Sequence, residues 1–189
     1  DALRVLDTSD LHCLREARQQ QQKAGGQLDL HNAVALREIA SIWRSDLTLM
    51  ISEFEQSLLE DVFHVSPDLL MYLPFMMPPP DISVWPDLST RQHFIMIGSL
   101  QHAPNLDAAR WCRDVIWPKI REQLPEAELH CYGSYGDRYA GELDVPKRGF
   151  FFKGRAEDAL ETMSHYRVNL APLRFGAGLK GKLFDGFAT

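Results

Sequence analysis

A glycine- and lysine-rich stretch near the C-terminal end decides the fold of this sequence. Residues 176–185 read GAGLKGKLFD, and they follow an apolar run over residues 167–173 that has the length of a buried strand. Cations lie at Arg174, Lys180 and Lys182, with no acidic residue between them. Glycines let backbone N–H groups approach an anion closely, and a helix N-terminus adds partial positive charge. The stretch therefore predicts a strand, a phosphate-binding loop and a helix; a flexible loop with solvated lysines is the alternative.

Strands and helices alternate from residue 91 onward. Strands are predicted over residues 93–97, 128–132, 149–152 and 167–173. Helices are predicted over residues 104–124, with a kink at Pro118, over 156–165 and from about Lys180. This alternation predicts an α/β fold with a parallel sheet covered on both faces. Because such sheets bind ligands beyond the carboxyl ends of their strands, we expect one edge to carry the loops after Ile97, Tyr132, Phe152 and Leu173.

The first part of the chain has a similar but less regular pattern. Short strands are predicted over residues 4–7, 47–51 and 69–73. Ser9 is expected to cap a helix that ends at Gly25-Gly26 and turns Leu11, Leu14 and Ala17 inward. A second helix is predicted over residues 32–44, with an apolar side formed by Leu36, Ile39, Ala40 and Trp43. Ser52 and Glu55 match the Ser-x-x-Glu capping box that opens a third helix.

A proline-rich segment separates these two parts. Prolines at positions 74, 78, 79, 80 and 86 exclude a regular helix and favour an extended linker. We therefore predict three regions: residues 1–74 as the end of an N-terminal domain, 75–90 as the linker, and 91–189 as a second, incomplete domain. The chain starts without Met and ends inside what reads as an unfinished helix, so we expect a fragment whose missing segments hold further functional residues.

Composition excludes several classes of protein. The net charge of −6 and the pI near 5.6 argue against nucleic-acid binding, which favours a basic surface. Cys13, Cys112 and Cys131 are odd in number and widely spaced, so we expect neither a disulfide framework nor a zinc site. No apolar run approaches the roughly 18 residues of a membrane span, and no leader pattern opens the chain. We expect a cytoplasmic protein without a transmembrane segment, in which any membrane contact is peripheral and made through missing regions.

The glycine-rich stretch also fits a different nucleotide motif. Gly176 to Lys182 matches Gly-x-x-x-x-Gly-Lys, the start of a P-loop. Leu183 stands where a P-loop needs Ser or Thr to hold magnesium, and the match follows a late strand rather than the first strand of its domain. We therefore disfavour a P-loop hydrolase, which remains a third hypothesis.

Residues 172–188, PLRFGAGLKGKLFDGFA, resemble a known family pattern. The pattern is Pro-Leu-x-x-Gly-x-Gly-x-Arg/Lys-x-Lys-x-x-Glu-Ala, found in a subgroup of the retaining glycosyltransferases of the GT-B fold, related to glycogen, sucrose and mannosyl transferases. Residues 94–100, 125–130 and 152–158 resemble further segments of the same donor domain, and residues 5–12 and 46–55 resemble the end of its acceptor-side domain. The resemblance implies an α/β, Rossmann-like parallel-sheet domain of a two-domain GT-B architecture, truncated at both ends.

The resemblance implies roles for the loop residues. Lys182 is the first choice, and Lys180 the second, to stabilise the departing phosphate, which makes a metal unnecessary. Asp185 replaces the family's Glu that binds the ribose; a helix N-terminal Asp that stabilises the dipole is the alternative. Ala177 replaces the first Glu of the family's pair, so sugar contacts are expected from backbone amides. The donor-binding loop thus comprises Gly176, Ala177, Gly178, Leu179 and Asp185.

Further roles follow from the other matched segments. Gly98 and Ser99 are expected to line the diphosphate, although a strand-ending Gly-Ser is also an ordinary turn. Arg155 and Ala156 are expected to offer backbone to the base, and Arg174 to reach phosphate or sugar. His12, next to Asp10 on the acceptor side, is expected to bind sugar hydroxyls or assist proton transfer; a structural or solvated helix residue is the alternative. Trp43, Trp111 and Trp117 are expected in the core.

The sequence thus predicts an enzyme that moves a hexose-type sugar from a nucleotide-diphosphate donor, its co-substrate, to a glycan, lipid or small-molecule acceptor. Transfer is expected to retain the anomeric configuration and to need no cofactor or metal. A catalytically silent nucleotide-sugar binder or scaffold of the same fold is the main alternative, because Ala177 and Asp185 replace both usual Glu residues.

Overall fold

The computed structural model describes residues 2–79, 83 and 85–189, which form two compact units. Unit 1 contains Asp1–Met77 and Phe175–Leu179, and unit 2 contains Pro78–Arg174 and Lys180–Thr189. The loop after residue 173 is therefore divided, because its middle packs within unit 1 and its two ends belong to unit 2. Within the predicted linker, residues 80–82 and 84 lie outside the described residues, and Pro80 is one of them.

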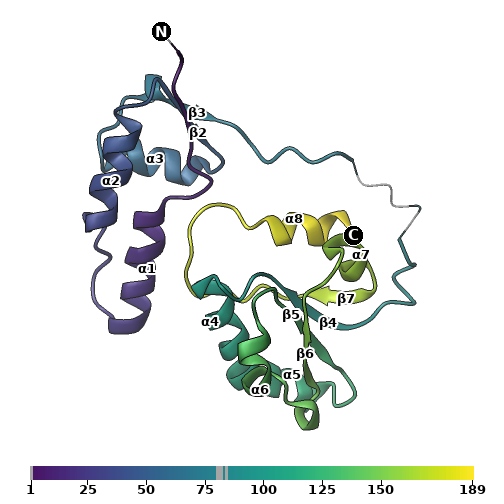
Figure 1. Cartoon of the computed structure of the whole chain (residues 1–189). Coiled ribbons are helices and arrows are strands. Elements are labelled where there is room, and N and C mark those ends of the chain that lie inside the picture. Colours follow the sequence, from purple (N-terminus) through teal and green to yellow (C-terminus); the bar gives the residue numbers. More distant parts are fainter. Residues whose placement is uncertain (1, 80–82, 84) are drawn as a thin grey trace. The chain divides into compact units, whose positions relative to one another are not determined.

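Unit 1 is built on a small parallel sheet (Figure 1). Its strand order is β1-β2-β3, with Val5 opposite Leu47 and Thr48 opposite Leu70. The elements are β1 (Val5–Asp7), α1 (His12–Ala24), α2 (Ala33–Ile42), β2 (Leu47–Met50), α3 (Glu53–Asp61), the 3-10 turn η1 (Pro67–Leu69) and β3 (Leu70–Tyr72). The three strands predicted in this part are confirmed.

The helices of unit 1 begin where polar groups satisfy their first N–H groups. Asn32 Oδ1 accepts from Val34 N and Ala35 N at the start of α2, and Ser52 Oγ accepts from Glu55 N at the start of α3, as the capping box predicts. The prediction that Ser9 caps α1 is wrong. Leu11 holds the cap position of α1, and carboxylates from other elements accept its first N–H groups.

The core of unit 1 shows which helix faces are buried. Leu11, Leu14 and Ala17 are buried, as predicted. The predicted inward face of α2 is partly wrong, because Leu36 is 74% exposed and Trp43 is 52% exposed. The helix turns a neighbouring stripe inward, which buries Ala35 and Ile42. The core consists of Leu11, Cys13, Leu14, Ala35, Ile42, Met50, Leu59, Val65, Leu70 and, from the loop after residue 173, Ala177.

Unit 2 is a four-stranded parallel sheet in the order β6-β5-β4-β7. Its elements are β4 (Gln92–Ile97), α4 (Ala103–Trp111), the π-helical segment η3 (Cys112–Ile116), α5 (Trp117–Gln123), β5 (Leu129–Tyr132), the short helices η4 (Asp137–Tyr139), α6 (Ala140–Leu143) and η5 (Pro146–Arg148), β6 (Phe150–Gly154), α7 (Ala159–Ser164), β7 (Tyr166–Asn169) and α8 (Gly181–Ala188). The predicted parallel sheet is confirmed.

Two predicted elements of unit 2 are shorter than expected for local reasons. Asp158 Oδ1 accepts from Glu161 N, so α7 starts at Ala159 rather than at Ala156. The last strand ends at Asn169 instead of Leu173, in keeping with Pro172, which has no N–H to donate to a neighbouring strand.

The predicted kink at Pro118 takes the form of a π-helical turn directly before α5, where the helix accommodates the missing proline N–H.

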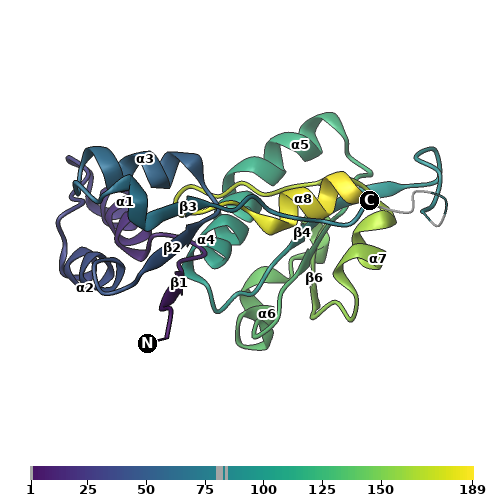
Figure 2. The same cartoon turned by 90° about the horizontal axis from the view of Figure 1, so that it is seen from above.

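Helices cover both faces of the unit 2 sheet. On one face Trp117 and Phe150 are fully buried among residues of α4, η3, α5 and α6. On the other face α7 and α8 pack against each other, and the C-terminal end of α8 lies beside α7 in both views (Figures 1 and 2).

The three cysteines are free and buried, and burial raises the pKa of the Cys112 and Cys131 thiols to about 12.

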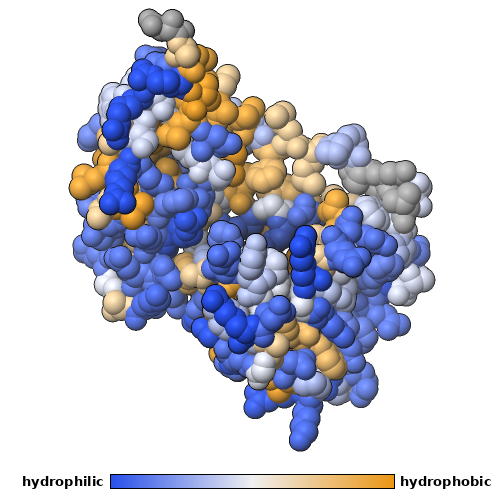
Figure 3. All heavy atoms as spheres, in the orientation of Figure 1, coloured by the Kyte–Doolittle hydropathy of each residue, from blue (hydrophilic) through white to orange (hydrophobic). Residues whose placement is uncertain are grey.

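The surface of unit 1 carries a band of apolar side chains (Figure 3). It follows the strands and the segment after β3, where the exposed apolar residues are Leu3, Val5, Met71, Tyr72, Phe75, Met76 and Met77. Among the helices that the structure describes, none is long and apolar enough to span a membrane.

The two tryptophans at opposite extremes of exposure test this description of the cores. Trp117 is fully buried and its Nε1 donates to the Arg148 carbonyl over 2.8 Å, so Trp117→Ala should cost about 3–5 kcal/mol in the unfolding of unit 2. Trp43→Ala, the matched control, should change stability by less than about 0.5 kcal/mol. Urea unfolding of both variants measures this. Equal losses would contradict the assignment of the core.

Candidate functional site

The loops at the carboxyl edge of the unit 2 sheet are joined by backbone hydrogen bonds. Gly98 N donates to Tyr132 O over 3.1 Å, Leu100 N to Ser134 O over 3.0 Å, and Gly133 N to Gly154 O over 2.7 Å. The loops after β4, β5 and β6 therefore share one edge, as predicted. Helix α8, which contains the last part of the glycine-rich stretch, begins at the same edge, because Lys182 in its first turn contacts Asn105 near the start of α4.

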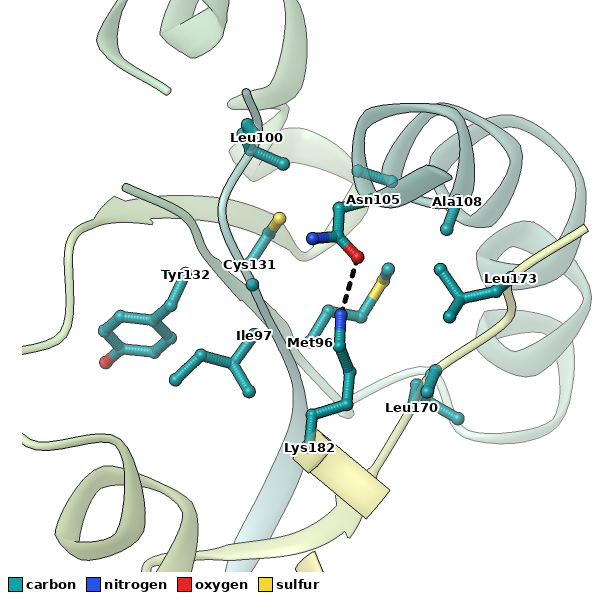
Figure 4. Close-up of a pocket in the computed structure, with 13 residues that line it drawn as sticks. Met96, Ile97, Leu100, Asn105, Ala108, Cys131, Tyr132, Leu170, Leu173 and Lys182 are labelled. Atoms are coloured by element: carbon teal, nitrogen blue, oxygen red, sulfur yellow. Dashed lines mark hydrogen bonds between the residues drawn. The ribbon is translucent and has the colours of Figure 1, made fainter. Parts of the chain in front are cut away.

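Lys182 points into a small pocket at this edge (Figure 4). Its Nζ donates to Asn105 Oδ1 over 2.7 Å, and Asn105 Nδ2 in turn donates to the Ser99 carbonyl over 2.9 Å. The free space is about 10 Å³, which is room for about one water molecule. Apart from Asn105 and Tyr132 the pocket is lined by apolar side chains, such as Met96, Leu170 and Leu173, and by Cys131.

The surroundings of Lys182 disfavour its charge. Burial lowers the pKa of its ammonium to about 8, and the positive charge of Lys180 lowers it further, while Cys131 acts in the opposite sense. Among residues 2–79, 83 and 85–189 no carboxylate lies within ion-pair distance of its Nζ. An anion placed beside this amine would therefore raise its pKa again and gain a charge-assisted hydrogen bond.

Gly98 lies directly beside the Lys182 amine. A Cβ atom at residue 98 would lie 2.6 Å from Lys182 Nζ and 2.9 Å from Asn105 Nδ2. Its φ of +156° is also one that L side chains rarely adopt. Ser99 shapes the same turn, because its Oγ accepts from Gln101 N over 3.3 Å. The structure thus brings Gly98, Ser99 and Lys182 together.

Other predicted donor residues of unit 2 lie apart from Lys182 or are already paired. The guanidinium of Arg174 is held by both carboxylate oxygens of Asp107 and lies over the partly buried ring of Trp111. Asp185 lies beyond the first turn of α8, so the alternative of a dipole-stabilising N-terminal Asp is wrong; its partial burial raises the pKa of its carboxyl. Arg155 is exposed in the loop after β6, next to the partly buried Ala156.

The middle of the glycine-rich stretch is fixed inside unit 1. Phe175 is 7% exposed and Ala177 is 5% exposed, with Ala177 packed in the core of that unit. The carbonyl of Gly176 accepts from Arg18 Nη1 over 2.8 Å, and the N–H of Gly178 donates to Glu55 Oε1. A Cβ atom at residue 178 would lie 2.7 Å from both Ser9 O and Asp10 Cβ, so only glycine fits there. Leu179 is 37% exposed.

His12 opens α1 beside Asp10 in unit 1. Its Nε2 lies 3.4 Å from Asp10 Oδ1, and its side chain is 55% exposed. Asp10 also pairs with Arg15. An exposed imidazole oriented by a carboxylate can accept or donate a proton at its outer face.

Comparisons with known proteins match both the sequence and the fold. A family model described as "Glycosyl transferases group 1" matches residues 91–189, more than half of the chain.

The chain belongs to the group 1 glycosyl transferases.

Solved structures of glycosyltransferases resemble this group 1 member in fold. A TarM mutant from S. aureus, crystallised with fondaparinux, alpha-GlcNAc-glycerol and UDP, is 11% identical with a TM-score of 0.63. The pneumococcal O-GlcNAc transferase GtfA, crystallised with UDP and GlcNAc, is 16% identical with a TM-score of 0.52. Each match covers 83% of this chain and 31% of the other, so the chain spans about a third of these structures. No curated protein matches at a significant level. The predicted α/β, Rossmann-like GT-B fold is confirmed.

Two residues of this glycosyl transferase were not predicted as parts of the site. Asn105 was not singled out from the sequence, although a polar residue in the first turn of the helix after Gly98 is a usable signal. Glu55 was predicted only as half of a capping box, and its long-range contacts to Leu11 and Gly178 could not be read from spacing. Within the described ranges, no three His, Cys, Asp or Glu side chains converge as a metal would require.

The lowered pKa of Lys182 predicts a pH dependence of folding. Its pKa is 10.5 as the ordinary value and about 8 in the fold, so the unfolded chain keeps the proton that the folded chain loses between these pH values. Stability contributed at this position therefore rises with pH from about 8 to 10.5 and is lowest below pH 8. Lys182→Met removes this desolvated charge, so we expect the variant to be about 1–2 kcal/mol more stable than the unchanged protein at pH 7. The gain is smaller than the full pKa shift would give, because the side chain is only partly buried.

Unfolding of unit 2 by urea at pH 7 and at about pH 10 measures this difference, which should shrink at the higher pH. Lys147→Met, at an exposed position, is the control and should show no such trend. A stability difference that is independent of pH would show that Lys182 is not desolvated.

Proposed function

We propose that the protein transfers a sugar from a nucleotide-diphosphate donor to an acceptor, with retention at the anomeric carbon and without a metal. The observation that carries this is Lys182, whose amine lies beside Gly98 and Asn105 with no described carboxylate to neutralise it. The first turn of α8 adds the partial positive charge of a helix N-terminus at the same place. This combination fits a diphosphate better than a neutral ligand.

The chemistry requires stabilisation of a leaving group. When the bond between the anomeric carbon and the diphosphate oxygen breaks, both bonding electrons stay on the oxygen, and negative charge grows there. Lys182 would meet that charge in surroundings of low dielectric, where a fixed donor lowers the barrier more than it would in water. Lys180, at the cap position of α8, is the second proposed cation.

The remaining donor contacts are proposed from position and resemblance. Gly98 and Ser99 would line the diphosphate, Arg155 and Ala156 the base, and Asp185 the ribose. Arg174 would have to leave Asp107 to reach the donor, so we give it the smallest part. Gly176, Ala177 and Leu179 would offer backbone to the sugar.

The ligands named for the structural neighbours support a first choice of donor. The TarM and GtfA structures were obtained with UDP, and with GlcNAc or a GlcNAc-glycerol conjugate. We propose that uridine diphosphate sugars are the first donors to test, that the transferred sugar is a hexose, and that the acceptor is a glycan, lipid or small molecule in the cytoplasm. His12 with Asp10 would bind or deprotonate the acceptor hydroxyl.

A catalytically silent nucleotide-sugar binder is the second candidate. It is favoured by Ala177, whose side chain lies in the core of unit 1 where a carboxylate for the sugar could not be placed without displacing that packing. Release or transfer of radiolabelled sugar from a panel of nucleotide sugars distinguishes the two. Tight donor binding without any turnover would favour the silent binder.

Removal of the Lys182 amine tests the proposed mechanism. Lys182→Ala should lower turnover of the best donor by on the order of a hundredfold or more, because a fixed donor to the leaving phosphate is lost. Lys147→Ala removes the same charge from an exposed site and should leave turnover within about twofold. Unchanged turnover in Lys182→Ala would show that another group stabilises the leaving phosphate.

A further inference from the structure

Glu55 is a buried carboxylate that binds two backbone amides far apart in the sequence. It is 2% exposed. Its Oε2 accepts from Leu11 N over 2.9 Å, and its Oε1 accepts from Gly178 N. A carboxylate buried to this extent is costly unless hydrogen bonds satisfy it, so both amides stabilise its charge, and it in turn fixes both of them.

We infer that Glu55 is a positioning residue of the glycosyl transferase, which sets the backbone of Phe175–Leu179 relative to the first turn of α1. This inference rests on the proposed function, because it assigns a role within the proposed donor loop and beside His12. All the groups concerned belong to unit 1.

The amide of Leu11 belongs to the turn that presents His12. Leu11 is the cap residue of α1, and the next two N–H groups, of His12 and Cys13, donate to the carboxylate of Glu38 over 2.7 Å each. Two carboxylates thus replace the side-chain cap that α1 lacks, at the end of the helix where its dipole favours negative charge. Glu55 therefore fixes the backbone from which His12 projects.

The amide of Gly178 belongs to the middle of the donor loop. The neighbouring residues are fixed as well, since Arg18 binds the Gly176 carbonyl and Ala177 is buried in the core. Gly178 itself touches the backbone of Ser9 so closely that no side chain fits. Glu55 thus completes a set of restraints on three successive residues.

The hydrogen bond between Gly178 and Glu55 changes how this part of the loop can act on the donor. The Gly178 N–H was expected to bind the donor, but in this structure it donates to Glu55. Glu55 therefore acts on the donor indirectly, since it fixes the backbone of the proposed donor loop around Gly178. A loop ordered before the donor arrives loses less conformational entropy on binding and holds its groups in the geometry of the transition state.

Substitution of Glu55 by Gln tests this role with a small change. Glu55→Gln keeps the size of the side chain and one accepting oxygen but places an NH₂ group against one of the two amides. We expect kcat/KM for the donor to fall about tenfold or more, since a hydrogen bond to a charged group is lost at a positioning contact. Glu53→Gln, at an exposed position in the first turn of α3, is the matched control and should leave kcat/KM unchanged.

Amide hydrogen exchange provides a readout that is independent of activity. By NMR, the Gly178 and Leu11 amides should exchange at least about tenfold faster in Glu55→Gln than in the unchanged protein, whereas amides of β2 should keep their rates. If the buried substitution unfolds unit 1, Arg18→Gln serves instead, because it releases only the Gly176 carbonyl and leaves Glu55 in place. It should speed exchange at Gly178 and lower kcat/KM in the same direction.

The two readouts separate the possible failures. Unchanged exchange at Gly178 together with unchanged kcat/KM in Glu55→Gln would overturn the inference. Faster exchange with unchanged kcat/KM would also overturn it, because Glu55 would then be only structural. Absence of turnover in the unchanged protein for every donor would overturn the proposed function, while the exchange rates would still decide whether Glu55 holds the loop.

Discussion

A lysine amine held in an apolar pocket is the interaction on which the site depends. Lys182 Nζ reaches Asn105 over 2.7 Å, and a Cβ atom at residue 98 would lie 2.6 Å from the same Nζ. Burial lowers the pKa of this amine to about 8, so the folded protein keeps a cation at a cost that an anionic ligand would remove. The sheet edge, the first turn of α8 and the pocket lining all serve to hold that amine in place.

Different parts of the glycine-rich stretch lie in different units. Its last part, with Lys182, and the preceding Arg174 belong to unit 2, whereas Phe175–Leu179 packs within unit 1. Backbone groups of that middle segment bind Arg18 and Glu55, and Ala177 fills part of an apolar core. Packing inside unit 1 therefore fixes the backbone groups in the middle of this stretch, whereas Lys182 stays beside the pocket of unit 2.

The strands, the glycine-rich loop and Lys182 could be predicted from the sequence because they depend on local patterns. Short apolar runs located the strands, and the glycines and lysines of residues 176–182 located the loop, the first turn of α8 and Lys182. Patterns failed where long-range contacts decide. The cap of α1 comes from Glu38 and Glu55 rather than from Ser9, and the buried stripe of α2 excludes Leu36 and Trp43 because Ala35 and Ile42 face the core. Spacing alone could not show that Glu55 meets Gly178.

Proton uptake on ligand binding shows directly whether a desolvated Lys182 amine meets the diphosphate. At about pH 8.5 the Lys182 amine should be mostly neutral, and a diphosphate beside it should raise its pKa, so binding of uridine diphosphate should take up about half a proton or more. Calorimetric titration in two buffers of different ionisation enthalpy measures this uptake. The binding enthalpies should differ between the two buffers in the unchanged protein and agree in Lys182→Met. Binding with equal enthalpies in both buffers for the unchanged protein would contradict it.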